Sequence, residues 1–167
     1  MRIAEVAEEA RARGNAFLEG LARTALARIW LALGALEQAE REAQAAAEIT
    51  SSNPTLNAPV QAVMAQVLLR TSRSVEALAA AKRGKELLDS LGTVEEGDAL
   101  IRLVFAEALH AVGDVDGARA ALSIAHDSIL RDAQRIRDEE IRSSFLSNVP
   151  EHARILALAR SWDARAT

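Results

Sequence analysis

Apolar residues recur every three or four positions along almost the whole chain, which is the spacing of one face of an α-helix. The clearest example is Ala99–Leu130, where two apolar helical patterns are separated by the turn-forming pair Gly113–Asp114. The second pattern is rich in alanine, and its small or apolar residues fall on one face at Ala118, Leu122 and Ala125. This stretch predicts a helical hairpin whose two helices approach each other closely.

The same arrangement of small residues occurs three times in the chain. Each copy starts with an alanine in the leading helix of a hairpin, namely Ala27, Ala65 and Ala106. The residues 12, 16 and 19 positions later are Ala39, Ala43 and Ala46, then Ala77, Ala81 and Gly84, then Ala118, Leu122 and Ala125. A larger apolar residue follows each leading alanine by three positions: Trp30, Leu68 and Leu109. Recurrence at fixed offsets is typical of stacked helical repeats.

These positions resemble the tetratricopeptide repeat (TPR), a helix-turn-helix unit with small residues where its helices cross. The resemblance extends from Arg2 to Leu130. The leading alanines are separated by 38 and 41 residues, against about 34 in most TPRs, and the late proline of the repeat occurs only as Pro54. Long repeats of this kind are similar to the C-terminal repeat segments of large bacterial serine/threonine kinases and ATPase regulators.

The resemblance implies an all-α fold, a TPR-like alpha-alpha superhelix that forms a single array. Residues 1–13 are expected to be a remnant helix of a preceding repeat. Three helical hairpins are expected at 14–53, 54–92 and 93–137, followed by two C-terminal capping helices within 138–167.

Turn-forming residues predict the helix ends inside these segments. Thr50–Pro54 is expected to be a loop, so that the next helix begins near Asn57, and the capping-box spacing of Thr93–Glu96 is expected to start another helix. An open apolar face is expected at the beginning of the chain, at Ile3, Val6 and Ala10. Near the other end, Ile141, Phe145 and Leu146 are expected to point inward, and Ile155, Leu156, Leu158, Ala159 and Trp162 to cover the third hairpin.

Composition narrows the classes of protein and partner. Apolar residues make up 50% of the chain but aromatic residues only 3%, so the core is expected to consist of Ala, Leu, Val and Ile. The absence of Cys excludes disulfides and thiolate metal sites. The net charge is −4 and the basic residues are dispersed, which argues against nucleic-acid binding.

No apolar run is long enough to span a membrane, and acidic residues occupy the start of the chain where a secretion signal would be apolar. We therefore expect a cytoplasmic protein, and its Ala- and Arg-rich composition suggests a bacterial source.

The sequence contains no arrangement that predicts catalysis. Glu107 and His110 form an E-x-x-H pair, but a di-iron site needs a second such pair and further carboxylates. His126 and Asp127 are adjacent and are expected to lie on different faces of a helix, where they could not act together. No glycine-rich phosphate-binding motif is present. We expect neither an enzyme nor a bound metal or cofactor.

The resemblance implies that the leading helices line an inner groove. The residues placed in it by the repeat register are Thr24, Arg28 and Leu31, then Ala62, Gln66, Leu69 and Arg70, then Leu103, Glu107 and His110. Their mixture of apolar and hydrogen-bonding groups suits an extended or helical peptide. The alternative for each residue is that it packs against a neighbouring helix and meets no partner.

The expected function is that of a protein-interaction scaffold that binds a protein or peptide in the groove, as part of a larger bacterial signal-transduction protein. One alternative is homodimerisation through the face at Ile3 and Val6 or through Trp162. A less favoured alternative is a small-molecule sensor, which would need an enclosed pocket near Glu107 and His110.

Overall fold

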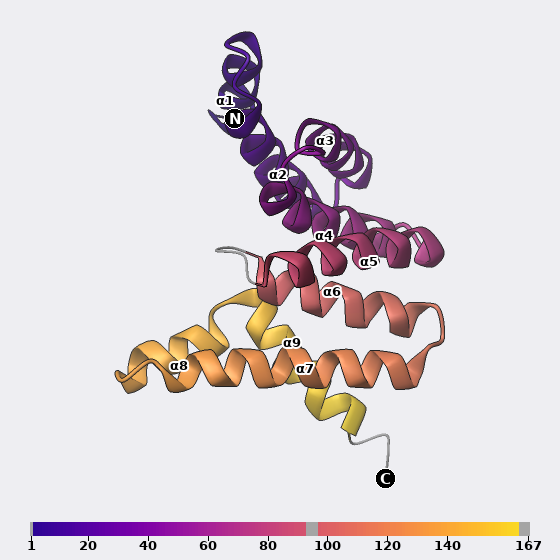
Figure 1. The fold of residues 1–167 in the computed structure, drawn as a ribbon, viewed down its shortest axis with the longest axis vertical. Coiled ribbons are helices and arrows are strands. Elements are labelled where there is room, and N and C mark those ends of the chain that lie inside the picture. The colour runs from indigo at the N-terminus through magenta and orange to yellow at the C-terminus, as the bar shows by residue number, and fades with distance from the viewer. Residues whose placement is uncertain (1, 93–96, 164–167) are drawn as a thin grey trace.

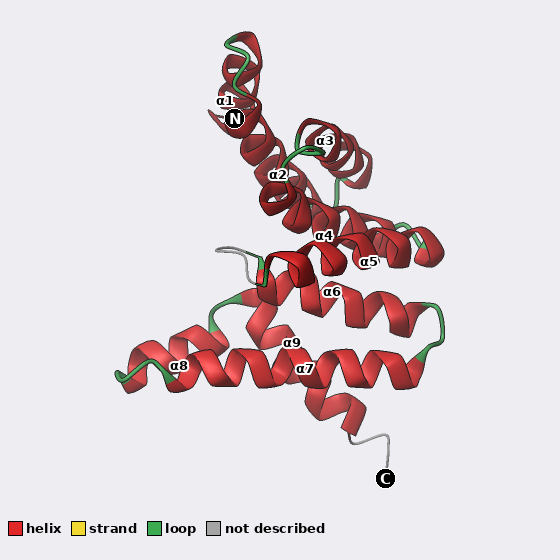
Figure 2. Cartoon of the chain, viewed as in Figure 1, coloured by secondary structure: helices red, strands yellow, loops and turns green. Residues whose placement is uncertain are grey.

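The computed structural model describes residues 2–92 and 97–163. Within these ranges the chain forms nine α-helices and no strand, so the fold is all-α (Figure 2). The helices are α1 (Arg2–Ala12), α2 (Ala16–Ala32), α3 (Leu36–Ile49), α4 (Pro54–Arg70), α5 (Ser74–Leu91), α6 (Asp98–Ala111), α7 (Val115–Gln134), α8 (Glu139–Ser147) and α9 (Pro150–Asp163).

Every helix packs against the next one in the chain. The pairs α2/α3, α4/α5 and α6/α7 form three antiparallel hairpins that succeed one another between the two ends of the molecule (Figure 1). The first helices of the hairpins also touch, α2 with α4 and α4 with α6, and α9 packs on both α6 and α7. This pattern of contacts is compatible with a stacked helical repeat.

The turns within and between hairpins follow from residues that cap helices. Asp114 accepts a hydrogen bond from the Gly117 backbone N–H and so caps α7. The preceding Gly113 has a φ of +90°, a left-handed conformation that glycine adopts without a steric penalty. Asn15 and Asp138 cap α2 and α8 in the same way.

The start of α4 differs from the prediction. Thr50–Pro54 was expected to be a loop, but α4 already begins at Pro54. Asn53 caps it by accepting a hydrogen bond from the Leu56 backbone N–H. Proline is well suited to the first helical position because its missing N–H would have no partner there. The loop therefore ends earlier than the pattern indicated, and Pro59, expected in the first turn, lies further inside the helix.

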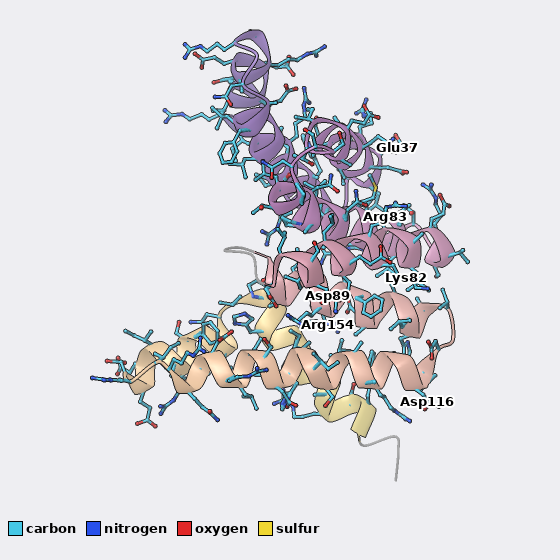
Figure 3. The ribbon with its side chains drawn as sticks, viewed as in Figure 1. Glu37, Lys82, Arg83, Asp89, Asp116 and Arg154 are labelled. Carbon is cyan, nitrogen blue, oxygen red and sulfur yellow. The ribbon has the colours of Figure 1, made fainter. Side chains whose placement is uncertain are left out.

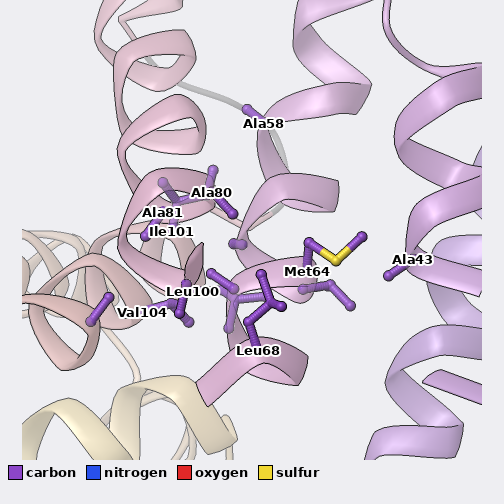
Figure 4. Packing of buried hydrophobic residues seen from close by; sticks show 14 of the residues in the cluster. Ala43, Ala58, Met64, Leu68, Ala80, Ala81, Leu100, Ile101 and Val104 are labelled. Atoms are coloured by element: carbon purple, nitrogen blue, oxygen red, sulfur yellow. The ribbon is translucent and has the colours of Figure 1, made fainter. Parts of the chain in front are cut away.

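The repeated small residues lie in the core. Ala27, Ala65 and Ala106 are fully buried, and every residue at the three later offsets of each copy is buried as well. At Gly84 a Cβ atom would lie 3.1 Å from the Ala58 carbonyl oxygen, so α4 and α5 approach too closely for a larger side chain to fit without movement. Figure 4 shows the centre of this packing, where Ala43 of α3 faces Met64 of α4 and the apolar side chains of α6 lie beyond.

The C-terminal helix completes a second core. Ile155, Leu158 and Trp162 of α9 pack with buried residues of α6 and α7, among them Leu109 and Leu122. With so few aromatic residues in the chain, these contacts are mainly aliphatic, and Trp162 is one of the largest buried groups. The α9 helix is therefore an integral part of the folded domain and not a loose tail.

Three local predictions need correction or fall outside the described residues. Ala10 is buried, with 2% exposure, because α1 packs on α2, and it is not part of an open face. Ile141 is 59% exposed and does not point inward, because α8 contacts only α7 and α9. The predicted capping box at Thr93–Glu96 lies outside the described residues, and α6 begins at Asp98 after Gly97, whose φ is +92°.

In the part of the chain that the structure describes, no helix combines the length and apolar character needed to cross a membrane.

Candidate interaction surface

The leading helices α2, α4 and α6 enclose an apolar hollow of about 390 Å³. Its rim carries Phe17 and Leu21 of α2, which are 58% and 41% exposed despite their size. Buried residues form its floor, including Val63 of α4 and Leu100 of α6. The remaining lining residues are Gly20, Thr24, Ala25, Arg28, Thr50, Thr55, Leu56, Pro59 and Gly97. Among the lining residues that the structure describes, Arg28 is the single charged one, so this lining suits an apolar side chain better than a polar one.

A polar hollow of about 930 Å³ adjoins the first, between α6, α7, α8 and α9. Arg28, Gly97 and Leu100 line both hollows, which therefore share a wall. Charged groups of the polar hollow are largely paired with one another: Arg28 with Glu151, Arg102 with Asp98, and Arg135 with Asp132. Mutual pairing leaves little net attraction for a simple anion.

Eight of the ten residues predicted to line a groove fall into three groups. Thr24 and Arg28 line the apolar hollow. Leu69, Arg70, Glu107 and His110 line a further hollow of about 540 Å³ against α9. Leu31 and Gln66 are half-buried and line none of these hollows.

Leu103 and Ala62 are not available to a partner. Leu103 is 3% exposed and packs with Ala106 and Ile155 in the C-terminal core. Ala62 is also buried, in the central core beside α5. Each was placed in the groove by its register, but the neighbouring helices close over it. Both residues therefore pack against a neighbouring helix, which was the alternative to contact with a partner.

Besides Leu103, three of the predicted residues contact α9 through polar or stacked side chains. Arg28 donates a hydrogen bond to Glu151 at 2.8 Å, and Arg154, labelled in Figure 3, donates one to Glu107 at 3.0 Å. The His110 and Trp162 rings are stacked, with centroids 4.8 Å apart and an angle of 13° between their planes. The C-terminal helix therefore occupies part of the surface that the repeat register assigned to a partner. The apolar residues of this helix were expected to cover the third hairpin, but its contacts with Arg28, Glu107 and His110 were not predicted, because α9 lies outside the repeating pattern.

Other apolar residues of the first hollow were missed for a different reason. The register considered positions from one turn before to one turn after the leading alanines, whereas Leu21, Pro59 and Leu100 stand six residues before Ala27, Ala65 and Ala106. Six residues correspond to about 1.7 turns of an α-helix. At this spacing the three residues lie on the same side of their helices as the predicted groove residues. These residues could have been identified by extending the repeat register toward the start of each leading helix.

The candidate chemical groups are engaged in structural contacts. Glu107 is paired with Arg154, and His110 stacks on Trp162. The described residues contain no group of three or more His, Cys, Asp or Glu side chains placed to hold a metal ion. His126 and Asp127 were expected to point apart, but His126 Nδ1 lies 3.4 Å from Asp127 Oδ1. Adjacent side chains on a helix can meet at the surface when both are long enough to bend toward each other. In the described part of the chain no serine hydroxyl is hydrogen-bonded to this histidine.

Comparison with known proteins gives no family for this chain: no family model matches it, and no curated protein sequence matches it significantly.

Proposed function

We propose that this protein is a non-catalytic interaction module, a TPR-like array that binds a peptide or protein segment against its leading helices. The burial of all three leading alanines and of the residues at their later offsets supports the repeat architecture. The contacts of α2 with α4 and of α4 with α6 also support it, because the first helices of TPR-like hairpins lie side by side.

The apolar hollow carries the functional part of the proposal. Large side chains such as Phe17 and Leu21 are exposed at the rim of a hollow whose floor is apolar, and exposed apolar groups around a concavity are typical of binding sites. Thr24 and Thr55 line the same hollow. The Thr24 hydroxyl donates to the Gly20 carbonyl oxygen, so toward a peptide backbone it can act as an acceptor. Because the helices are already folded, little conformational entropy is lost by the module when a segment binds.

A selection from a random peptide library tests the proposal. Peptides retained by the wild-type protein are measured again with Leu21→Asp, which places a charge at the rim of the apolar hollow. The matched control is Val75→Asp at the start of α5, where the valine is 78% exposed and lies outside the hollow. We expect the first change to weaken binding at least tenfold and the second to leave it unchanged.

Two results would contradict the proposal. The library could yield no peptide that binds the wild-type protein, or the peptides that it yields could bind Leu21→Asp as tightly as the wild type. Circular dichroism of both variants shows whether the helices remain intact, and an exposed rim residue is expected to have little effect on them.

Self-association is the second candidate, and one observation favours it. Val6 of α1 and Leu18 of α2 are exposed apolar residues close to the start of the chain. The route through Trp162 is not supported, because that side chain is buried against His110 and the core of α6 and α7. Light scattering over a concentration series, with Val6→Glu as the variant, distinguishes a dimer from a monomeric interaction module.

A further inference from the structure

One ion pair connects two helices whose backbones are not packed against each other. Arg28 Nη2 of α2 lies 2.8 Å from Glu151 Oε1 of α9, although the two residues are 123 positions apart in the chain. The backbones of α2 and α9 do not pack against each other in the described residues. The first hairpin and the C-terminal helix are therefore joined by long side chains that reach across the polar hollow.

Each partner of this pair is held in place by its own helix. Glu151 lies in the first turn of α9, where the helix dipole stabilises a negative charge. The α9 helix is anchored by Ile155 and Trp162 in the C-terminal core. Arg28 follows directly after the fully buried Ala27 of α2. The two charges are thus presented by two separately packed parts of the molecule, and their distance reports how those parts are placed relative to each other.

The pair also lies at the wall between the two hollows. Arg28 lines both of them, and Glu151 lines the polar one. The side chains are 53% and 16% exposed, so solvent and salt ions reach the contact. A contact of this kind is weak and is screened by salt. It can therefore open without unfolding any helix.

We propose that Arg28 and Glu151 form a latch that holds the array in its closed curvature. In an array whose helices touch mainly their neighbours, small rotations at successive interfaces add up to a large displacement between the ends. A bond between the first hairpin and α9 opposes that displacement directly. When the latch opens, the wall between the apolar and polar hollows opens with it.

The latch goes beyond the proposed function and does not depend on it, because it concerns the shape of the protein without a partner. Its consequence for binding is that an acidic group of a partner competes with Glu151 for the Arg28 guanidinium. A partner that combines an apolar side chain for the hollow with a carboxylate for Arg28 is favoured by this arrangement.

A distance measurement between two spin labels tests the latch. The chain contains no cysteine, so Ala32→Cys in α2 and Ala157→Cys in α9 provide two labelling sites at exposed positions without any other change. We expect a narrow distance distribution in the otherwise wild-type protein. Arg28→Glu and Glu151→Arg each place like charges together, and each is expected to shift the distribution to longer distances and broaden it. The double variant with both changes restores opposite charges and is expected to restore the narrow distribution.

A matched control uses another ion pair of the same helix. Arg154 pairs with Glu107 of α6, but α6 and α9 are also joined by buried apolar contacts. Arg154→Glu is therefore expected to leave the distance distribution unchanged. The proposal is overturned if Arg28→Glu and Glu151→Arg keep the wild-type distribution, or if the double variant fails to restore it. Circular dichroism of each variant establishes that its helices are intact, and peptide binding plays no part in the measurement.

Discussion

Alanine and glycine allow the helices of this chain to pack closely, because residues this small let two helices cross at a short distance. A buried Leu or Ile contributes more apolar area, but it also pushes two helix axes apart. The core here combines both kinds of residue, with alanines at the crossings and larger residues such as Val63 and Leu68 between them. The stability of each hairpin is therefore expected to be sensitive to added volume at a few small positions.

Ala27→Leu is expected to destabilise the protein by about 1–3 kcal/mol, because three additional carbon atoms must enter a closely packed crossing. Ala27 is fully buried and belongs to the central core with Ala43 of the partner helix. The measurement is urea unfolding followed by circular dichroism. Ala32→Leu is the control, since Ala32 is exposed in the same helix. Equal stability of the two variants would show that Ala27 is not at a tight crossing.

Gly20→Ala is expected to destabilise the protein even though alanine is the better helix former. A Cβ atom at Gly20 would lie 2.6 Å from Thr50 Cγ2. Thr50 is buried and cannot move freely, because its hydroxyl donates to the Ala46 carbonyl and accepts from Asn57 Nδ2.

Thr50→Ser supplies the test, because it removes the methyl group and retains the hydroxyl. In that background Gly20→Ala is expected to stabilise the protein by up to about 1 kcal/mol, the difference in helix propensity between the two residues. Urea unfolding of the four proteins of this cycle gives the coupling between the sites. Additive effects would contradict the predicted clash.

Charged side chains also join neighbouring helices to one another. Arg23 of α2 has contacts to Glu8, Glu19 and Glu42, which come from α1, α2 and α3. Burial lowers the pKa of Arg23, but the hydrogen bonds that Arg23 donates to Glu19 and Glu42 outweigh this effect, and the pKa lies above its usual value. Arginine is charged at every accessible pH, so Arg23 remains a hydrogen-bond donor that joins the three helices.

A second arginine introduces a dependence on pH through its partner. Arg73 donates two hydrogen bonds to Glu76 and one to Glu40 of α3. The bonds from Arg73 hold the pKa of Glu76 below its usual value. A carboxyl group with a lowered pKa in the folded state contributes stability above the pKa of the unfolded chain, about 4.3, and loses it as the pH falls through the folded value.

Glu76→Gln is therefore expected to lower the free energy of unfolding near pH 7 and to have a diminishing effect as the pH falls below about 4. The measurement is urea unfolding of both proteins at several pH values between 7 and 3. In the Arg73→Gln background the same substitution is expected to have almost no effect at any pH. A loss that is independent of pH would show that the carboxylate is not stabilised by Arg73.

The molecule as a whole is held together by contacts between neighbouring helices, so its stability is distributed along the array. The clusters formed by α1 and α2, by the central helices, and by α6, α7 and α9 are largely separate groups of buried residues. In such an arrangement a destabilising substitution in one cluster has little effect on the stability of the others.

Ile155→Ala is expected to destabilise the C-terminal part by about 2–5 kcal/mol, because Ile155 is fully buried and its truncation leaves a cavity. Amide hydrogen exchange is expected to show the largest loss of protection in α6, α7 and α9, with α2 and α3 much less affected. An equal loss of protection along the described chain would indicate one cooperative unit and contradict this picture.

The repeated helical hairpins could be predicted from spacing because helix formation and amphipathic packing are local properties. The 12, 16 and 19 offsets identified buried positions in three hairpins, and the glycine turn at Gly113 was correctly recognised. Helix ends were predicted less well, as at Pro54, because a cap depends on the conformation of the residue before it as well as on its identity.

The candidate surface could be predicted only in part. Thr24 and Arg28 lie at the apolar hollow as the register indicated, but Leu103 is closed over by neighbouring helices and Glu107 is bound by α9. A repeating pattern describes how one hairpin meets the next, because these contacts recur with the period of the sequence. It contains no information about a helix outside the period, and the reach of α9 from Glu107 to Arg28 depends on the rotation from the first hairpin to the third. That rotation is a property of the assembled chain, and for this reason the hairpins were readable from the pattern while the hollows and the latch were not.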